Sequence, residues 1–338
     1  MPASLPFSKA FDFASGATGE RFQNPFWKLK EYFFGARFRK AVFEVKKFGN
    51  GLVSAAMHKR HEARKPSTKV EPAGTDPAQN NLINLLLDHI EDRQVVADAA
   101  MNYLSAGAVS IIHSTLNYAH ISVGRDTTAQ SLTWTFYLLM RNPTGTKRIV
   151  SHLQDISTSE SQLPLSFDSI QSSGLPYVAA VFNESLRLYP PVPIELKECT
   201  APTTFPDGTW LHKGAVVMWA TWAMGRSKKI WGDDADVFRP ERWLIANASE
   251  NTPTLTTKTA FEFPVFNGGP RSCLGKRMAE LLAIHVIASL TWKFEFEEAT
   301  DVATGWGYGS RAGERQSQNS LTLPMEGGLP CYVRRRVI

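Results

Sequence analysis

Apolar side chains recur at helical spacing in the first part of the chain. Between Pro25 and His61 an aromatic or aliphatic residue returns every three or four positions, and lysines and arginines fill the positions between them. This spacing predicts a basic amphipathic helix with a buried aromatic face; the alternative is a helix that lies in a membrane surface. The apolar positions are Phe26, Leu29, Tyr32, Phe33, Phe38 and Val42.

The pattern changes near residue 190. Residues 1–190 have mostly helical spacing, apart from a polar, proline-broken loop at 62–80. Residues 190–225 are rich in Pro, Thr, Val and Trp, and Pro206-Asp207-Gly208 stands between two β-prone runs. This arrangement predicts a β hairpin.

Helical spacing returns in the last part of the chain, residues 226–338. We expect a helix from Cys273 to Phe294 and a final hairpin over Ser320–Val333, turned at Glu326-Gly327-Gly328. The predicted fold class is therefore mainly α with a minor β portion, as a single domain over 1–338.

Composition and charge narrow the choice of partners. The 37 basic and 32 acidic residues give a net charge of +5, which mildly favours lipid headgroups or an acidic redox protein and is too small to indicate nucleic acid. Cys199, Cys273 and Cys331 are odd in number and far apart, so they predict neither a disulfide framework nor a zinc site. Residues 1–16 have no pattern of a signal peptide or membrane anchor.

The most informative stretch is the cysteine loop, residues 266–275, which reads F-N-G-G-P-R-S-C-L-G. Its glycines let the backbone turn tightly beside a flat ligand, and the proline stiffens that turn. Cys273 stands at the start of the predicted helix, where a thiolate is favoured, and Arg271 can bind a carboxylate through two hydrogen bonds. A lone cysteine is usually a small buried hydrophobe. The combination of thiolate, cation and glycine turn predicts a haem site instead.

Two other motifs carry charge. Glu184 and Arg187 are three residues apart on one predicted helix, the spacing of an ordinary surface ion pair, and a P-E-R segment follows at 240–242. The sequence G-R-D-T-T at 124–128 either caps the start of a helix or places an acid and an alcohol inside one.

Together and in this order, the three motifs resemble those of the cytochrome P450 family, over most of the chain from about Phe11. The resemblance implies a P450 fold, incomplete at the N-terminus, with haem b as cofactor and the Cys273 thiolate as axial ligand of the iron. Arg271 would contact a haem propionate, with a second basic residue near a propionate at Lys197. The implied cofactor-binding residues are Cys273, Arg271, Phe266, Gly269, Gly275 and Lys197.

The same resemblance implies roles away from the cysteine. Arg242 would join Glu184 and Arg187 in a buried structural network, because a buried charge without its partners costs several kcal/mol. Asp126 and Thr127 would deliver protons to bound dioxygen. The residues implied to line the substrate pocket are Pro193, Ile194, Leu321 and Thr322.

The chain departs from the family pattern in two places. The family's large N-terminal section, with its membrane anchor, has no counterpart in this sequence. Residues 108–124 also intervene between the Ala-Gly that ends at Gly107 and the Arg-Asp-Thr-Thr that begins at Arg125. Seventeen residues would rotate one half of a continuous helix by roughly 260° relative to the other, out of register. We hypothesise that they are a retained intron.

Resemblance to the family implies insertion of one atom of O2 into a C–H bond, with electrons from NADPH delivered by a flavoprotein reductase. The stretches at 186–193 and 321–329 resemble fungal fatty-acid and alkane hydroxylases, which favours a long-chain fatty acid or alkane over a terpenoid or polyketide. Two other interpretations are a non-catalytic fragment that cannot retain haem and a peripheral membrane-binding module. We expect a monomer on the cytosolic face of the endoplasmic reticulum membrane, with an apolar small-molecule substrate and no nucleic-acid partner.

Overall fold

A computed structural model gives the fold in two compact units, Met1–Arg125 and Asp126–Ile338, and each is described by itself. The prediction of a single domain over 1–338 stays a prediction. The residues that the structure describes are 10, 13, 14, 17, 26–63, 87, 88, 90, 92, 93, 95–97, 123–157, 174–246, 253–299, 314–317 and 322–337.

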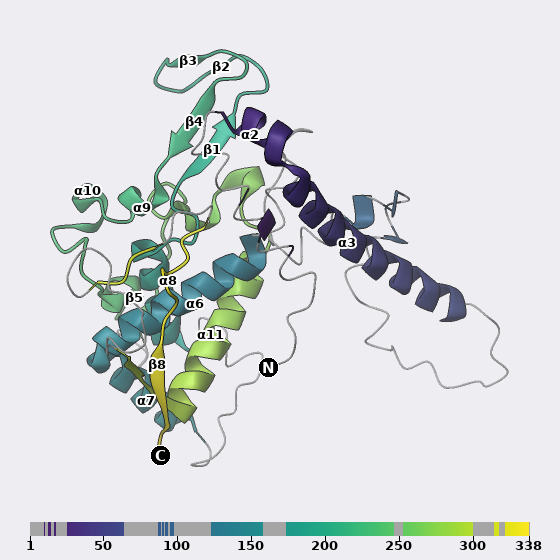
Figure 1. Cartoon of the computed structure of the whole chain (residues 1–338). Helices are drawn as coiled ribbons and strands as arrows, with labels where there is room; N and C mark the ends of the chain where they lie inside the picture. The colour runs from purple at the N-terminus through teal and green to yellow at the C-terminus, as the bar shows by residue number, and fades with distance from the viewer. Residues whose placement is uncertain are drawn as a thin grey trace. The chain divides into compact units, whose positions relative to one another are not determined.

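The predicted basic helix in the first unit is two helices. Helix α2 spans Trp27–Phe34 and helix α3 spans Ala36–Ala63, with a break at Gly35 (Figure 1). A Cβ at Gly35 would lie 2.2 Å from the backbone oxygen of Glu31, so the close turn between the helices requires glycine.

The predicted burial of the aromatic face is wrong for α2. This helix buries none of its residues, and Phe26, Tyr32 and Phe33 are all more than half exposed. On α3, Phe38 and Val42 are buried in a small apolar cluster, as predicted. The two helices differ because, within the described segments, apolar residues such as Ala14 pack against α3 but not against α2.

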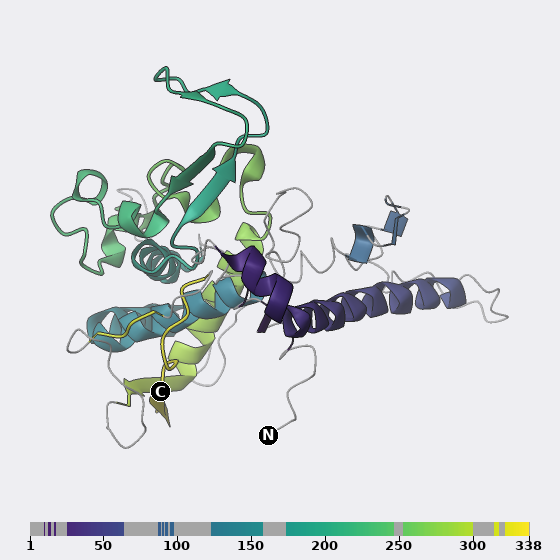
Figure 2. The ribbon, with the colours of Figure 1, turned by 45° about the horizontal axis from the view of Figure 1, so that its top comes forward.

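Four long helices make the core of the second unit: α6 (Val123–Arg141), α7 (Pro143–Ile156), α8 (Pro176–Leu188) and α11 (Lys276–Lys293). Helix α8 is central, because all of its residues except Asn183 are buried. Its run of apolar residues has no polar face, which is typical of a helix enclosed by others. In two views α6 and α11 have their N-terminal ends near each other (Figures 1 and 2).

The β portion lies where the composition changes. Strand β1 (Glu195–Glu198) pairs antiparallel with β4 (Val216–Trp219), and β2 (Thr203–Thr204) pairs with β3 (Trp210–Leu211). The β2–β3 pair is the predicted hairpin, and it extends from the end of the β1–β4 pair (Figure 2). Its turn contains Gly208 at φ +89°, a conformation that favours glycine.

The predicted final hairpin over Ser320–Val333 is wrong. Strand β8 (Cys331–Arg335) pairs antiparallel with β7 (Phe294–Glu298), which directly follows α11. Pro324 and Pro330 lack the backbone N–H that a ladder needs. Among the residues that the structure describes here, the pairing beside the turn is an isolated bridge between Ser317 and Met325.

Short elements connect these parts. They are α9 (Thr221–Met224), α10 (Lys228–Trp231), η2 (Pro240–Trp243), β5 (Leu244–Ile245), β6 (Thr254–Leu255), η3 (Pro264–Phe266) and η4 (Gly269–Arg271). The whole is the predicted fold class, mainly α with small sheets. Across the described ranges, no helix has the length and apolar character needed to cross a membrane.

Candidate functional site

The cysteine loop is closed by a short backbone hydrogen bond. The Cys273 N–H donates to the carbonyl oxygen of Phe266 at 2.7 Å. Between them Asn267 and Gly269 adopt positive φ values of 55° and 62°. A Cβ at Gly269 would touch nothing within 4 Å, so the backbone conformation, and not crowding, favours glycine there. The loop therefore turns sharply and leaves open space over Gly269.

The surroundings of the Cys273 thiol differ from the prediction. Helix α11 begins at Lys276, three residues beyond the predicted start. Burial raises the pKa of the half-buried thiol, and hydrogen bonds from the backbone N–H groups of Gly275 and Lys276 lower it only in part. The backbone N–H groups at the helix start thus favour the thiolate, as predicted, while burial of the sulfur opposes it. A cation bound to the sulfur would reverse the balance, because it favours the charged form.

The basic residues near this loop are exposed. Arg271 lies in η4, and Lys197 lies on β1. Neither forms an ion pair with another described residue. Their charges are thus accessible to an anionic group.

These features fit an iron porphyrin. The half-buried sulfur of Cys273 can be an axial ligand, and the glycine turn admits a flat ring beside it. The exposed guanidinium of Arg271 can bind a propionate. Phe266 packs against the main core below the loop, and the Lys276 ammonium lies 5.6 Å above its ring. Gly275 is buried and caps the start of α11.

Glu184 is the centre of a buried charge network, and its two oxygens accept hydrogen bonds from five donors. Arg187 donates to both oxygens at 2.8 Å, and both side chains are fully buried. Arg242 donates through Nε at 2.9 Å. The remaining donors are Trp243 Nε1 at 2.9 Å and the Arg239 N–H at 2.8 Å. The structure thus brings together Glu184, Arg187 and Arg242, the three charged residues that the resemblance groups.

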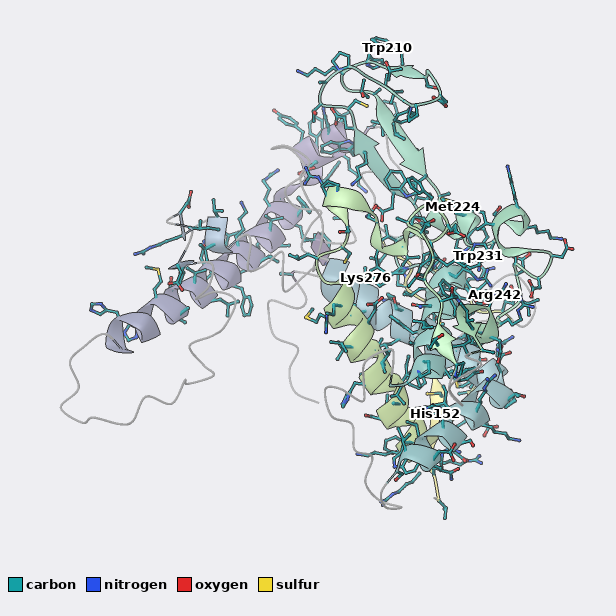
Figure 3. All side chains as sticks on the ribbon, turned by 180° about the vertical axis from the view of Figure 1, so that it is seen from behind. His152, Trp210, Met224, Trp231, Arg242 and Lys276 are labelled. Atoms are coloured by element: carbon teal, nitrogen blue, oxygen red, sulfur yellow. The ribbon has the colours of Figure 1, made fainter. Side chains whose placement is uncertain are left out.

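Arg242 has a second carboxylate partner. Its Nη2 lies 3.3 Å from Asp234, whose other neighbour is the guanidinium of Arg239 at 2.9 Å. Desolvation is the largest single effect on Asp234 and acts to raise its pKa. The Arg242 hydrogen bond and the charges of Arg242 and Arg239 together outweigh it, so the pKa of this carboxyl is lowered. Figure 3 shows Arg242 beside Trp231, whose carbonyl it also binds at 3.2 Å. The network therefore holds two carboxylates, those of Glu184 and Asp234, against three guanidiniums.

Asp126 and Thr127 lie inside α6, as its fourth and fifth residues. The alternative that this motif caps a helix is therefore wrong. Thr127 is half-buried, and its carbonyl accepts a hydrogen bond from the Ser131 hydroxyl at 2.7 Å. Proton delivery by Asp126 and Thr127 stays a prediction.

Two of the predicted substrate residues lie on neighbouring segments. The Leu323 N–H donates to the Pro191 carbonyl at 2.9 Å, so the chain around buried Thr322 runs beside the one that leads to Pro193. Ile194 is 54% exposed. Leu321 lies outside the described residues, as does 108–122 of the hypothesised intron.

Sequence reasoning missed four polar residues of the site. Trp243 and Asp234 belong to the Glu184 network, and Glu195 binds Asn267 of the cysteine loop. The position of Trp243 directly after the P-E-R segment was a usable signal. Glu195 has no such signal, because its partner Asn267 is 72 residues away. Asp234 lies close to Arg239 and Arg242 in the sequence, but no motif includes it.

Comparison with known proteins gives consistent matches. The family profile described as Cytochrome P450 matches residues 13–304. Cytochrome P450 94A1 of Vicia sativa is 32% identical over 98% of this chain and 57% of its own length. Cytochrome P450 94B1 of Arabidopsis thaliana is 31% identical over 97% of this chain and 57% of its own length. Noroxomaritidine synthase 2 of Narcissus pseudonarcissus is 29% identical over 99% of this chain and 59% of its own length.

These relatives bear on two predictions. All three are plant proteins, so the comparisons do not support a specific resemblance to fungal hydroxylases, and they give the intron hypothesis no support. The chain spans less than three fifths of the length of each relative.

Proposed function

Because the chain belongs to the cytochrome P450 family, we propose that it is part of a haem-thiolate monooxygenase in which Cys273 binds the iron. The observation that carries the proposal is the cysteine loop, with its half-buried thiol, glycine turn and exposed Arg271. Members of the family use haem with an axial cysteine thiolate and receive electrons from NADPH through a reductase. Bound haem would activate dioxygen for insertion of one oxygen atom into a C–H bond.

The protein's own residues would then have separate tasks. Cys273 would bind the iron, and Arg271, with Lys197 nearby, would hold propionates by charge-assisted hydrogen bonds. The Glu184 network would fix the segments behind the loop. Asp126 and Thr127 would hold and pass protons during oxygen activation.

Replacement of single cysteines tests the iron ligand. In Cys273→Ser we expect loss of the Soret band that marks thiolate-bound haem in the reduced, CO-bound protein. Cys199→Ser is the matched control, because Cys199 is also half-buried and lies outside the loop. A thiolate-type Soret band that persists in Cys273→Ser would contradict the assignment.

The same spectrum tests the competing interpretation. If the chain is a non-catalytic fragment, the unsubstituted protein will show no thiolate-type Soret band after reconstitution with haem. The partial coverage of its relatives makes this a specific alternative. Far-ultraviolet circular dichroism of the same sample separates a folded protein without haem from an unfolded one.

We propose a long-chain fatty acid or alkane as the substrate class. The support is the apolar character of Pro193 and Ile194, two of the residues implied to line the substrate pocket. Substrate-induced changes of the haem spectrum test it: a spin-state shift with a long-chain fatty acid or alkane, and none with a terpenoid or polyketide of similar size, is the expected result. The reverse preference would contradict it.

The exposed aromatics of α2 favour a membrane surface as a further partner, as expected for a protein at the endoplasmic reticulum. Phe33 and Phe34 are 67% and 79% exposed, and Lys28 and Lys30 lie on the same helix. Apolar side chains flanked by lysines bind anionic lipid interfaces. We expect vesicles that contain phosphatidylserine to sediment the protein, and the double variant Phe33→Ser/Phe34→Ser to bind less. Equal binding by both proteins would contradict this role.

A further inference from the structure

We propose that Glu195 is a positioning residue for the cysteine loop and that it acts through Asn267. The inference rests on the proposed function, because the loop matters as the holder of an iron ligand. Glu195 lies on β1, more than 70 residues before the loop. The contact between them is made by the side chains alone.

The backbone at Asn267 is unusual. Among the described residues, Asn267 is the one non-glycine residue with positive φ, at 55°. With ψ at −169°, this conformation is one that glycine adopts almost alone, and it costs a side-chain-bearing residue roughly 1–3 kcal/mol. A residue held in it must be stabilised by its surroundings.

The stabilising partner is the carboxylate of Glu195. The Asn267 amide nitrogen lies 3.2 Å from both carboxylate oxygens of Glu195, and both residues are partly buried. Glycine would adopt the same φ without cost, but it would not supply this donor. The presence of asparagine is thus explained by its hydrogen bonds to Glu195 on β1, which we call the Glu195–Asn267 tie.

The hydrogen bond between Asn267 and Glu195 affects the iron ligand because of the residues on either side of Asn267. Phe266 precedes Asn267, and the Phe266 carbonyl accepts the hydrogen bond from the Cys273 N–H at 2.7 Å. On the other side, a Cβ at Gly268 would lie 2.6 Å from the Cβ of Ala260. The loop is therefore packed closely at Gly268 and tied at Asn267, and these two constraints set the direction of the Phe266 carbonyl.

Glu195 is itself held by a regular element. Strand β1 pairs with β4 in continuous register, with Glu195 opposite Trp219. Because the strand is fixed by backbone hydrogen bonds, its carboxylate is a fixed point for the more irregular loop. A positioning side chain works best from such a rigid element.

The first measurement is hydrogen exchange of the 264–275 segment in the full chain. In Glu195→Ala and in Asn267→Gly we expect the Cys273 amide to exchange about tenfold faster, the factor for loss of one hydrogen bond to a charged acceptor. Glu195→Gln keeps an acceptor oxygen and should recover most of the protection. Glu198→Gln is the matched control, since Glu198 is exposed at the end of the same strand, and it should leave exchange unchanged.

The double variant Glu195→Ala/Asn267→Gly shows whether the two residues act through their mutual hydrogen bond or destabilise the loop independently. If the two residues act through each other, the double variant exchanges no faster than either single variant. Additive effects, or unchanged exchange in Glu195→Ala, would overturn the proposal. Asn267→Gly keeps the backbone conformation, so it remains informative if Glu195→Ala fails to fold.

The second measurement is spectroscopic. In Glu195→Ala we expect part of the thiolate-type Soret band of the reduced, CO-bound protein to be replaced by that of haem without thiolate, with recovery in Glu195→Gln. An unchanged band would overturn the link to the iron ligand. Absence of the thiolate band in the unsubstituted protein would refute the proposed function instead, and hydrogen exchange would still decide the tie.

Discussion

Neutralising Glu184 is the sharpest perturbation of the buried network. In Glu184→Gln the side chain keeps its volume but loses its charge, and five donors then face a single carbonyl oxygen and an amide group. Arg187 is fully buried and has no other carboxylate partner among the described residues. Leaving a buried charge without its partner costs about 3–5 kcal/mol. We expect the free energy of unfolding to fall by this amount.

Removing Arg242 should cost less, although it breaks contacts with the same carboxylate. In Arg242→Met, Glu184 keeps Arg187, and Asp234 keeps Arg239 at 2.9 Å. Both negative charges stay paired, so the loss is that of hydrogen bonds to a charged group, about 1.5–3 kcal/mol. Arg242→Met should therefore lose less stability than Glu184→Gln, because it leaves no buried charge without a partner.

Buried tryptophans give a local signal for this test. Trp231 and Trp243 are 6% and 1% exposed and contact the network directly. Urea unfolding followed by tryptophan fluorescence, to which these two of the nine tryptophans contribute, measures the stability, with equal m-values as the condition for comparison. Glu241→Gln is the control, since this neighbouring carboxylate is half exposed and its ion pair with Arg148 is worth less than about 1 kcal/mol. Equal losses for Glu184→Gln and Glu241→Gln would refute the reasoning.

Two further predictions concern packing and pH. Gly225→Ala should destabilise the fold by about 1–3 kcal/mol, because its Cβ would lie 2.1 Å from the Arg187 carbonyl oxygen. Gly51→Ala, whose Cβ would have nothing within 4 Å, should instead stabilise α3 by about 0.5–1 kcal/mol, and thermal unfolding measures both effects. Burial and the Glu241 carboxylate raise the pKa of Tyr177 to about 12, so the folded state keeps a proton that the unfolded state loses. The resulting stability is present below about pH 10 and is lost as the pH rises toward 12, and unfolding of Tyr177→Phe should lack this dependence.

Local patterns predicted the elements well and their partners poorly. The β2–β3 hairpin was predictable because its turn residues are contiguous with its strands. The pairing of β8 with β7 was not, because the two strands are separated by more than 30 residues and the glycines at 327–328 suggested a local hairpin. Gly35 divides the first basic helix, although its neighbours keep the helical period.

The candidate site shows the same limit. Cys273 and its loop were found because the motif is contiguous, and Glu184 with Arg187 because they are one helical turn apart. The backbone N–H groups that favour a Cys273 thiolate were predictable from the helix start, but the burial of the sulfur, which raises its pKa, was not. Glu195 could not be found, because only the folded chain places it against Asn267.

The Glu184 network has a role beyond pairing charges, and this role explains why its cations are arginines. The chain from 225 to 239 has little regular structure, so many of its carbonyls have no partner in a helix or a sheet. Arg187 donates to the carbonyls of Gly225, Ala235 and Val237, and Arg242 donates to those of Trp231 and Asp234.

Five carbonyls are thus satisfied by two side chains whose remaining N–H groups bind carboxylates. A lysine has a single charged nitrogen and cannot donate to carboxylates and carbonyls in so many separate directions at once. Glu184 keeps the two guanidiniums in place, and the guanidiniums hold an irregular segment that apolar packing alone does not order. The stability of this segment therefore depends on charge, which is why Glu184→Gln should affect it more than the removal of any single exposed ion pair.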